Sequence, residues 1–346
     1  MKHALHRFTN RNILDLLETG GITAAPRANG RVFPVNGIAK DVMRVLSGLL
    51  VNLGVEIRFH QRVEELLLEG GRVRGVKTGE SFIPARHLIL ATGGASYPQT
   101  GTTGDGFLMA EQSGHRLVKV RAALAPIRIR PTIPGDWQGV AIRGGCLSVV
   151  QNGKPIARWT DDVLFTHEGL SGPATLEVSR AAALARETGP VSLRMDFFPG
   201  KEFQTVDEEL QALIRMQPGR MIGTLLGQWL PNRIVERLLR SRAIDPEQRG
   251  HAFPRDQRRL VVRLLKEWEM GAVEAVLLER GEVTAGGVAL GEVDPRTMES
   301  RRVGGLYLCG EILDIAGPIG GYNLQAAFST GFVAGDTAAS RVQNAT

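Results

Sequence analysis

Cysteine is scarce in this chain, and its scarcity excludes two common devices of protein architecture. Only Cys146 and Cys309 occur among the 346 residues, far apart and without the Cys-x-x-Cys or histidine-rich spacing of a zinc site. A disulfide framework is excluded too, because such frameworks use several pairs in a short chain. We therefore expect two buried cysteines that pack as small apolar residues, and no metal site.

Long apolar runs are also missing. No run of about 18 apolar residues predicts a membrane span, and the basic residues 1–20 lack the apolar stretch of a signal peptide. Hydrophobic residues make up 43% of the chain and charged residues 23%, which is the balance of a globular protein. The sequence therefore predicts a globular, cytoplasmic protein without a membrane partner.

Acidic residues are few in one stretch. Between Arg215 and Lys266, twelve Lys or Arg residues stand against four Asp or Glu, an excess of eight that is larger than the net charge of +6 of the whole chain. Two interpretations stay open here: a solvated helical surface, or a binding surface for an anionic partner such as RNA.

The order of apolar periodicities indicates nested domains. The expected elements of the first half, in chain order, are a helix at 37–53, a strand at 55–63, a hairpin, a strand at 85–94, a helix at 104–115 and antiparallel strands within 124–195. Short helices within 205–268 follow, then a strand at 281–293 that we expect to rejoin the antiparallel strands, a strand at 302–314 and a helix at 320–339. Helix followed by strand predicts a parallel sheet. The last strand and helix have no sheet of their own nearby, so we expect them to complete the first domain.

The predicted class is therefore α/β: a Rossmann-like domain with a nested antiparallel β-barrel-like insert that itself carries a small helical insert. The predicted boundaries are 1–120 and 300–346 for the α/β domain, 121–198 and 271–299 for the barrel-like insert, and 199–270 for the helical insert.

Three glycine-bearing segments stand where a predicted strand or loop meets a helix, which is where ligands bind open α/β sheets. They are Ala91, Thr92, Gly93 and Gly94; Gly310 and Glu311; and Gly320, Gly321, Tyr322 and Asn323. Glycine allows close approach of the backbone, the carboxylate of Glu311 would accept hydrogen bonds from polyol hydroxyls, and the last helix would present its positive N-terminal end to a developing negative charge. A turn or tight packing explains any one segment alone, but together they predict an FAD site.

The chain resembles, over nearly its whole length, the bacterial BaiN/RdsA-type (aminoacetone-oxidase-like) NAD(P)/FAD-dependent oxidoreductases. The motifs that carry the resemblance are GRVFPV, LILATGGASYPQTGTTGDG, LFTHEGLSGPA, TAGGVALGEVDPRTMES and GLYLCGEILDIAGPIGGYNLQAAFSTGFVAG. The resemblance implies an FAD domain interrupted by a barrel-like insert with its own helical insert, and FAD contacts near Val63 and at the three segments. It also implies reduction of a conjugated carbon–carbon double bond by hydride from flavin N5, with NAD(P)H as transient co-substrate.

One departure from the family pattern bears on cofactor binding. Family members begin with a strand and a GxGxxG loop for the FAD pyrophosphate, and this sequence contains neither; GTTGDG at 101–106 has different spacing. We therefore expect an N-terminal truncation that removes an opening βαβ unit of roughly 30 residues. Weak or absent FAD binding and uncovered apolar sheet surface would follow.

His167 and Tyr97 are the candidate catalytic residues. The His167 imidazole could transfer the proton, although a structural role stays open. Tyr97 could donate a proton, with ring packing as the alternative. The basic stretch favours a uracil base in ribosomal RNA as substrate. Three alternatives remain: a small-molecule enone, an amine oxidised as in amine oxidases, or a truncated chain with neither cofactor nor activity.

Overall fold

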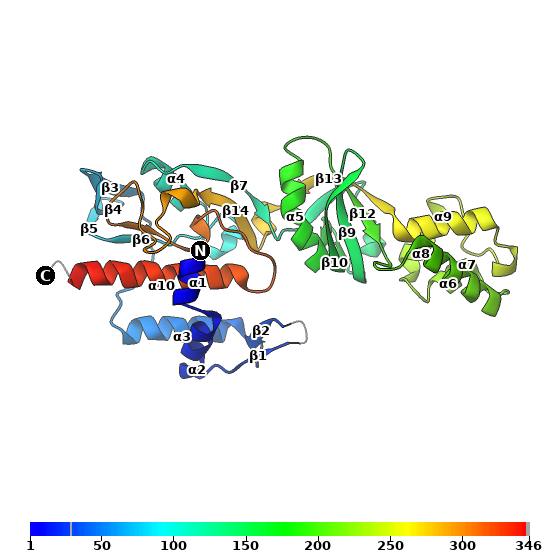
Figure 1. The fold of residues 1–346 in the computed structure, drawn as a ribbon, viewed down its shortest axis with the longest axis horizontal. Helices are drawn as coiled ribbons and strands as arrows, with labels where there is room; N and C mark the ends of the chain where they lie inside the picture. Colours follow the sequence, from blue (N-terminus) through cyan, green and yellow to red (C-terminus); the bar gives the residue numbers. More distant parts are fainter. Residues whose placement is uncertain (28–29, 344–346) are drawn as a thin grey trace. The chain divides into compact units, whose positions relative to one another are not determined.

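The computed structural model describes residues 1–27 and 30–343 (Figure 1). The chain divides into two compact units, one formed by residues 1–120 and 283–346 and the other by residues 121–282. We call them unit 1 and unit 2. Helices and sheets are mixed in both, so the predicted α/β class is confirmed.

Unit 1 is built from short sheets and helices. Its main elements are α1 (Lys2–Arg7), α2 (Asn10–Thr19), β1 (Ala24–Pro26), β2 (Val32–Pro34), α3 (Ala39–Asn52), β3 (Glu65–Glu69), β4 (Arg72–Thr78), β5 (Ser81–Pro84), β6 (Leu88–Leu90), η1 (Pro98–Thr100), α4 (Asp105–Gln112), β7 (Leu117–Ala123, which runs into unit 2), β14 (Val283–Val288), η5 (Leu290–Glu292), β15 (Leu306–Leu308), η6 (Gly310–Ile312) and α10 (Tyr322–Gln343). The last strand and helix do join the first half of the chain. β15 pairs in parallel with β6, with Leu306 opposite Leu88.

The segment 55–63 corrects one expectation, because it forms no strand. His60 has a φ of 57°, and the side chain of Phe59 is 75% exposed. A strand needs a neighbour that pairs its backbone groups, and none is recorded for this segment among the described residues. The hairpin that follows is present: β3 and β4 are joined by Gly70 and Gly71, both at positive φ.

The predicted helix at 37–53 is present as α3, but its apolar side is only partly covered. Val45 and Leu46 pack against the small cluster of Ile13, Leu17 and Ile22, yet no residue of α3 is fully buried. On the sheet itself, Ile89 of β6 is 38% exposed. Unit 1 therefore presents apolar side chains at its surface within the described residues.

Unit 2 combines a closed antiparallel barrel with a group of helices. Its elements are β8 (Ile127–Arg130), η2 (Gly135–Trp137), β9 (Ala141–Gln151), β10 (Lys154–Thr166), β11 (Gly169–Ser171), α5 (Pro173–Ala185), β12 (Ser192–Asp196), α6 (Phe203–Met216), α7 (Ile222–Leu226), α8 (Asn232–Arg240), η3 (Gly250–Ala252), α9 (Arg255–Lys266), β13 (Trp268–Val276) and η4 (Leu278–Arg280). The barrel order is β10-β11-β8-β13-β12-β9. Asn152 and Gly153, at φ values of 52° and 74°, form the tight turn between β9 and β10.

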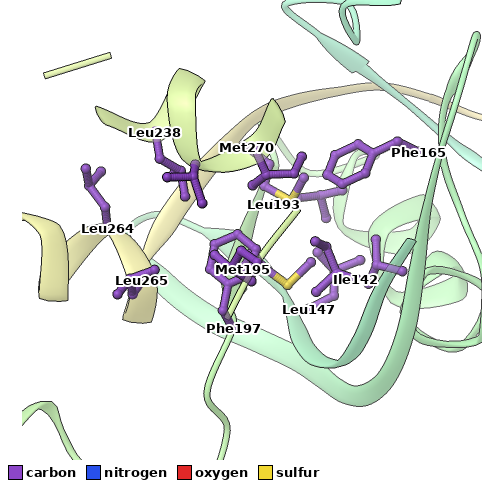
Figure 2. Packing of buried hydrophobic residues seen from close by; sticks show 14 of the residues in the cluster. Ile142, Leu147, Phe165, Leu193, Met195, Phe197, Leu238, Leu264, Leu265 and Met270 are labelled. Atoms are coloured by element: carbon purple, nitrogen blue, oxygen red, sulfur yellow. The ribbon is translucent and has the colours of Figure 1, made fainter. Parts of the chain in front are cut away.

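One hydrophobic cluster runs through the barrel and the helices of unit 2. Figure 2 shows Leu193 and Met195 of the barrel in the same packed group as Leu238 of α8 and Leu265 of α9. The barrel and the helices therefore share a core and form one compact unit.

The strand predicted at 281–293 appears as β14 but pairs outside the barrel. β14 forms a two-stranded sheet with β7, and the boundary between the units falls after Glu282. Residues 283–299, which the sequence places in the barrel-like insert, thus lie in unit 1. Across the described part of the chain, the helices are too short or too polar to cross a membrane.

Candidate functional site

Segments far apart in the sequence meet at Glu311, just beyond β15. Its Oε1 atom accepts a 2.6 Å hydrogen bond from the backbone N–H of Thr284 and a 3.3 Å hydrogen bond from the hydroxyl of Ser96. Thr284 is fully buried, and its Oγ1 accepts the N–H groups of Ala95 at 2.8 Å and Ser96 at 3.0 Å. Because these bonds join the glycine loop, β14 and η6, the three segments form one rigid cluster.

Gly94 lies where this cluster is tightest. A Cβ atom at this position would overlap Thr284 Oγ1 and would lie 2.5 Å from Glu311 Oε1. Gly93 has a φ of 77°, a conformation that favours glycine. The sequence predicts that the glycines of this loop let a ligand approach the backbone. In the structure, the absence of a side chain at Gly94 lets Thr284 and Glu311 pack directly against the loop.

The other residues expected in this loop lie at its start. Ala91 and Thr92 follow β6 directly and are exposed, while α4 packs over Thr92 at Gly106. Val63 is half-buried beside the core of unit 1, next to an ion pair of 2.6 Å between Arg62 and Asp105 of α4.

The third predicted segment precedes the long helix α10. Gly320 and Gly321 have φ values of 133° and 92°, and a Cβ atom on Gly321 would meet no atom within 4 Å. Asn323 fixes the loop: its Oδ1 accepts the N–H of Gly317 at 2.7 Å, and its Nδ2 donates to the carbonyl of Gly317 at 3.0 Å. Tyr322 is 62% exposed, so the positive end of a 22-residue helix opens to solvent.

Helix α10 also connects this segment to the Glu311 cluster. The N–H of Gly310, which has a φ of 76°, donates to Thr330 Oγ1 at 2.9 Å. Thr330 lies about two helical turns after Tyr322. The predicted Gly310–Glu311 and Gly320–Asn323 segments are therefore both anchored on one helix.

These residues fit a flavin cofactor. Glu311 is partly exposed, and among the described residues its recorded hydrogen bonds all use Oε1, which leaves Oε2 to accept hydroxyl groups. The open backbone at Gly321 lets a ring approach, while the ring of Tyr322 lies beside Gly320, and the start of α10 offers N–H groups to negative charge. Glu311, Gly93 and the loop 320–323 are partly or fully exposed and are the groups that would hold FAD, whereas the predicted contact Gly94 is buried against Thr284 and Glu311.

The two candidate catalytic residues lie in different units. Tyr97 directly follows Ser96 of the Glu311 cluster, has a φ of 55°, and is 47% exposed. His167 is exposed in the turn between β10 and β11 of unit 2. Its neighbour Glu168 forms an ion pair of 2.5 Å with Arg280. Tyr97 is thus placed beside the cluster, and the role of each residue stays a prediction.

The cysteines differ from each other more than expected. Cys309 is 4% exposed, and burial raises the pKa of its thiol to about 11. Cys146 lies on β9 and is only partly buried, so the expectation of two buried cysteines is wrong for this one. Within the described residues, no group of three or more His, Cys, Asp or Glu is arranged to hold a metal ion.

Thr284 is the residue of this site that the sequence reasoning missed. The glycine pair that follows Thr284 in the stretch TAGG could have indicated a site here. The sequence instead predicts that this strand joins the barrel, away from the glycine loop. The contacts of Thr284 arise from pairing between segments almost 190 residues apart, which local periodicity does not report.

A second polar network, which the sequence reasoning also missed, has the residue types of a hydrolase triad but is buried. His115 Nε2 lies 2.9 Å from Ser300 Oγ, and its Nδ1 lies 3.2 Å from Glu292 Oε2. Ser300 Oγ also accepts hydrogen bonds from the N–H groups of Arg302 at 3.0 Å and Val303 at 2.9 Å. Since both of these bonds use the oxygen as acceptor, the Ser300 hydroxyl donates its proton to His115 Nε2. Ser300 is 8% exposed, so it holds a turn in place and is not an accessible nucleophile.

The burial of this network favours the neutral form of His115. Burial lowers the pKa of His115, and the attraction of Glu292 opposes that shift only in part. The hydrogen bond from Arg302 is the main reason that the pKa of Glu292 is lowered, so its carboxylate stays ionised and accepts the Nδ1 proton of His115.

The chain is similar to known proteins over most of its length. Residues 1–337 match the family described as HI0933-like protein Rossmann domain. The chain is 30% identical over 335 residues to the ribosomal RNA dihydrouridine synthase of Haemophilus influenzae, an alignment that covers 96% of this chain and 80% of the relative. It is also 30% identical over 341 residues to the 3-dehydro-bile acid delta(4,6)-reductase of Clostridium scindens, covering 98% and 83%.

A solved structure has a more distant likeness. The open conformation of a flavocytochrome c3 fumarate reductase aligns with a TM-score of 0.43 at 18% identity, over 95% of this chain and 62% of that chain's length. The family match spans most of the sequence. The two relatives are each 30% identical to this chain, and the alignments cover 80% and 83% of their lengths. The chain therefore belongs to the HI0933-like family of Rossmann-domain flavoprotein oxidoreductases.

Proposed function

We propose that this protein is an FAD-dependent reductase of a conjugated carbon–carbon double bond, and that a uracil base in ribosomal RNA is its substrate. The observation that carries the proposal is the cluster at Glu311, which joins the glycine loop, Thr284 and η6 in unit 1. Relatives named as a ribosomal RNA dihydrouridine synthase and a bile acid reductase support the reaction class, since both names describe saturation of a double bond.

The residues of the cluster would bind and orient the cofactor. Glu311 would accept hydrogen bonds from the ribityl hydroxyls, and the backbone at Gly93, which is partly exposed, would lie against the cofactor. The start of α10, behind Gly320 and Gly321, would stabilise negative charge on the ring. When bound, FAD would supply the hydride chemistry, and NAD(P)H is the proposed reductant.

A side chain must then deliver a proton to the α-carbon of the substrate. Tyr97 is the first candidate because it follows the anchored Ser96 and is accessible. His167 is the second. In single-turnover assays, Tyr97→Phe should slow product formation while flavin reduction by NAD(P)H is unchanged; the same split for His167→Gln would assign the proton to His167 instead.

The first test is the absorbance spectrum of the purified chain, followed by titration with FAD. We expect flavin bands between roughly 350 and 450 nm, and a weaker FAD affinity for Glu311→Gln, which keeps the shape of the side chain but loses its charge. Glu18→Gln, a change of the same kind at an exposed position of α2 in unit 1, is the control. The proposal is wrong if the wild type shows no spectrum of bound flavin either as purified or after FAD is added. The alternative of a chain without cofactor or activity would then remain.

The second test concerns the substrate. Ribosomal RNA from cells that lack the enzyme, incubated with the chain and NADPH or NADH, should gain dihydrouridine, which mass spectrometry detects as two added hydrogens. A small-molecule enone is the second candidate, favoured by the bile acid reductase. Turnover of an enone without any change in the RNA would select it. Action on ribosomal RNA would also place the protein in the cytoplasm.

A further inference from the structure

The structure sorts the cations of residues 215–266 into two groups. Arg258 donates to Asp207 Oδ1 at 2.7 Å, and Lys266, which is 8% exposed, donates to Asp196 Oδ2 at 2.6 Å and to the carbonyl of Phe198 at 2.8 Å. These two cations hold the helices to one another and to the barrel. Most of the others point to solvent.

Three of the exposed cations lie along one side of α8. Arg233, Arg237 and Arg240 follow the spacing i, i+4 and i+7, which places them within one face of a helix. The opposite side of α8 is buried in the unit 2 core by Ile234, Val235, Leu238 and Leu239. We call the three arginines the α8 arginine face.

The α8 arginine face borders a concave surface. The three guanidinium groups, with Asp136, Trp137, Glu236 and Ser241, line a depression of about 450 Å³ within unit 2. A concave lining of this kind allows several donors to reach one phosphodiester segment.

Uncharged partners orient two of these arginines and leave their charge available. Arg233 Nη1 donates to the backbone carbonyl of Asp136 at 2.7 Å, and the guanidinium of Arg237 lies 5.6 Å from the ring centroid of Trp137. Arg240 pairs with Glu236 at 2.9 Å, but both side chains are more than half exposed, so a phosphate can compete for it. Asp136, which is exposed, contributes the other carboxylate of the lining.

We propose that the α8 arginine face binds the phosphodiester backbone of an RNA substrate, an inference that rests on the proposed function. One guanidinium group can bind two phosphate oxygens at once. The excess of eight positive charges over residues 215–266 would also attract a polyanion to this surface. A lipid membrane fits less well. The one large apolar side chain of the depression, Trp137, is 3% exposed and cannot insert.

The test measures binding of a short fluorescein-labelled, uridine-rich RNA by anisotropy over a series of salt concentrations. The variant R233Q/R237Q/R240Q should bind at least about tenfold more weakly, and the slope of log K against log salt should fall by about 2, the value for three lost phosphate contacts to a single strand. Arg237→Gln alone should weaken binding by about threefold, and it keeps the proposal testable if the triple variant fails to fold.

A second triple variant is the matched control. Arg255, Arg259 and Arg263 are exposed on α9 at spacing i, i+4 and i+8, and R255Q/R259Q/R263Q removes the same charge from the same unit. We expect its affinity to stay within about threefold of wild type. Equal losses in both triple variants, or wild-type binding by the α8 variant, would overturn the proposal.

Two further measurements separate this inference from the proposed function. If the wild type makes dihydrouridine and the α8 variant binds RNA equally well, only the inference fails. If the wild type retains FAD but binds no RNA, both the RNA substrate and the α8 site fail. Binding of vesicles of phosphatidylserine and phosphatidylcholine, lost in the α8 variant while RNA binding is unchanged, would assign the surface to membranes and also overturn it.

Discussion

The backbone N–H of Thr284 and Oε1 of Glu311 are joined by a hydrogen bond of 2.6 Å, and the Thr284 hydroxyl holds the loop that follows Gly94. The first strand after unit 2 is therefore attached to the predicted flavin residues by both its main chain and its side chain.

Thr284→Val keeps the shape of the side chain and removes its acceptor. The N–H groups of Ala95 and Ser96 would lose their partner in a buried site, which costs roughly 1–3 kcal/mol for each unsatisfied donor. We expect lower stability in chemical denaturation and weaker FAD binding. Thr284→Ser retains the hydroxyl and should restore FAD affinity; equal weakening by Ser and Val would show that the hydroxyl is not responsible.

Gly94→Ala should destabilise unit 1 by about 1–3 kcal/mol, because the added methyl group collides with Thr284 and Glu311. Thermal unfolding is the measurement. Gly331→Ala is the control, since it adds the same group on α10 with no atom within 4 Å and should be neutral or stabilising by up to about 1 kcal/mol. A Gly94→Ala protein as stable as wild type would contradict the close packing at this point.

Stability should fall as the pH drops through the range in which His115 titrates. The pKa of His115 is lowered in the folded protein from its ordinary 6.5. At a pH between the folded pKa and 6.5, the unfolded chain therefore binds more protons than the folded one. The loss therefore begins as pH falls toward about 6.5 and is complete below the folded pKa. Glu292, whose pKa is lowered from 4.5, adds a separate loss in more acidic solution.

The measurement is urea unfolding from about pH 8 to about pH 5, with His115→Asn beside the wild type. Asparagine keeps a donor for Glu292 but does not titrate, so the dependence of the unfolding free energy on pH should be shallower in this range. A variant with the same pH dependence as wild type would remove His115 as its cause.

The two thiols should react at very different rates. With a maleimide reagent near neutral pH, Cys146 should be labelled in the folded protein, because it is partly accessible. Cys309 should react only after unfolding, since it is 4% exposed and its pKa of about 11 keeps it protonated. Mass spectrometry should find one label per native chain and none on native Cys146→Ser; rapid labelling of native Cys309 would contradict its burial.

Sequence alone predicts the elements whose signals are local. Asn152-Gly153 has the residue types that positive φ requires, and the turn between β9 and β10 forms there. The isolated last strand predicts that β15 must find a sheet in the first half of the chain, and it pairs with β6. Local chemistry and the need to bury an apolar strand were sufficient in both cases.

The features that depend on distant partners could not be predicted in this way. Residues 55–63 have the composition of a strand, but a strand forms only where a neighbour accepts its hydrogen bonds. Glu311 could be selected because a carboxylate just beyond a predicted strand can accept hydrogen bonds from polyol hydroxyls. Its partner Thr284 could not, because the pairing of β14 with β7 brings it there.

The pairing of β7 with β14 has a consequence for how this protein can evolve. The chain leaves unit 1 along one of these strands and returns along the other, so residues 121–282 are a single excursion between neighbouring strands. The entropy of closing such a loop grows only with the logarithm of its length. Changes in the length of unit 2 would therefore disturb the Glu311 cluster little, so unit 2 could diverge within a lineage while the cluster in unit 1 is inherited intact.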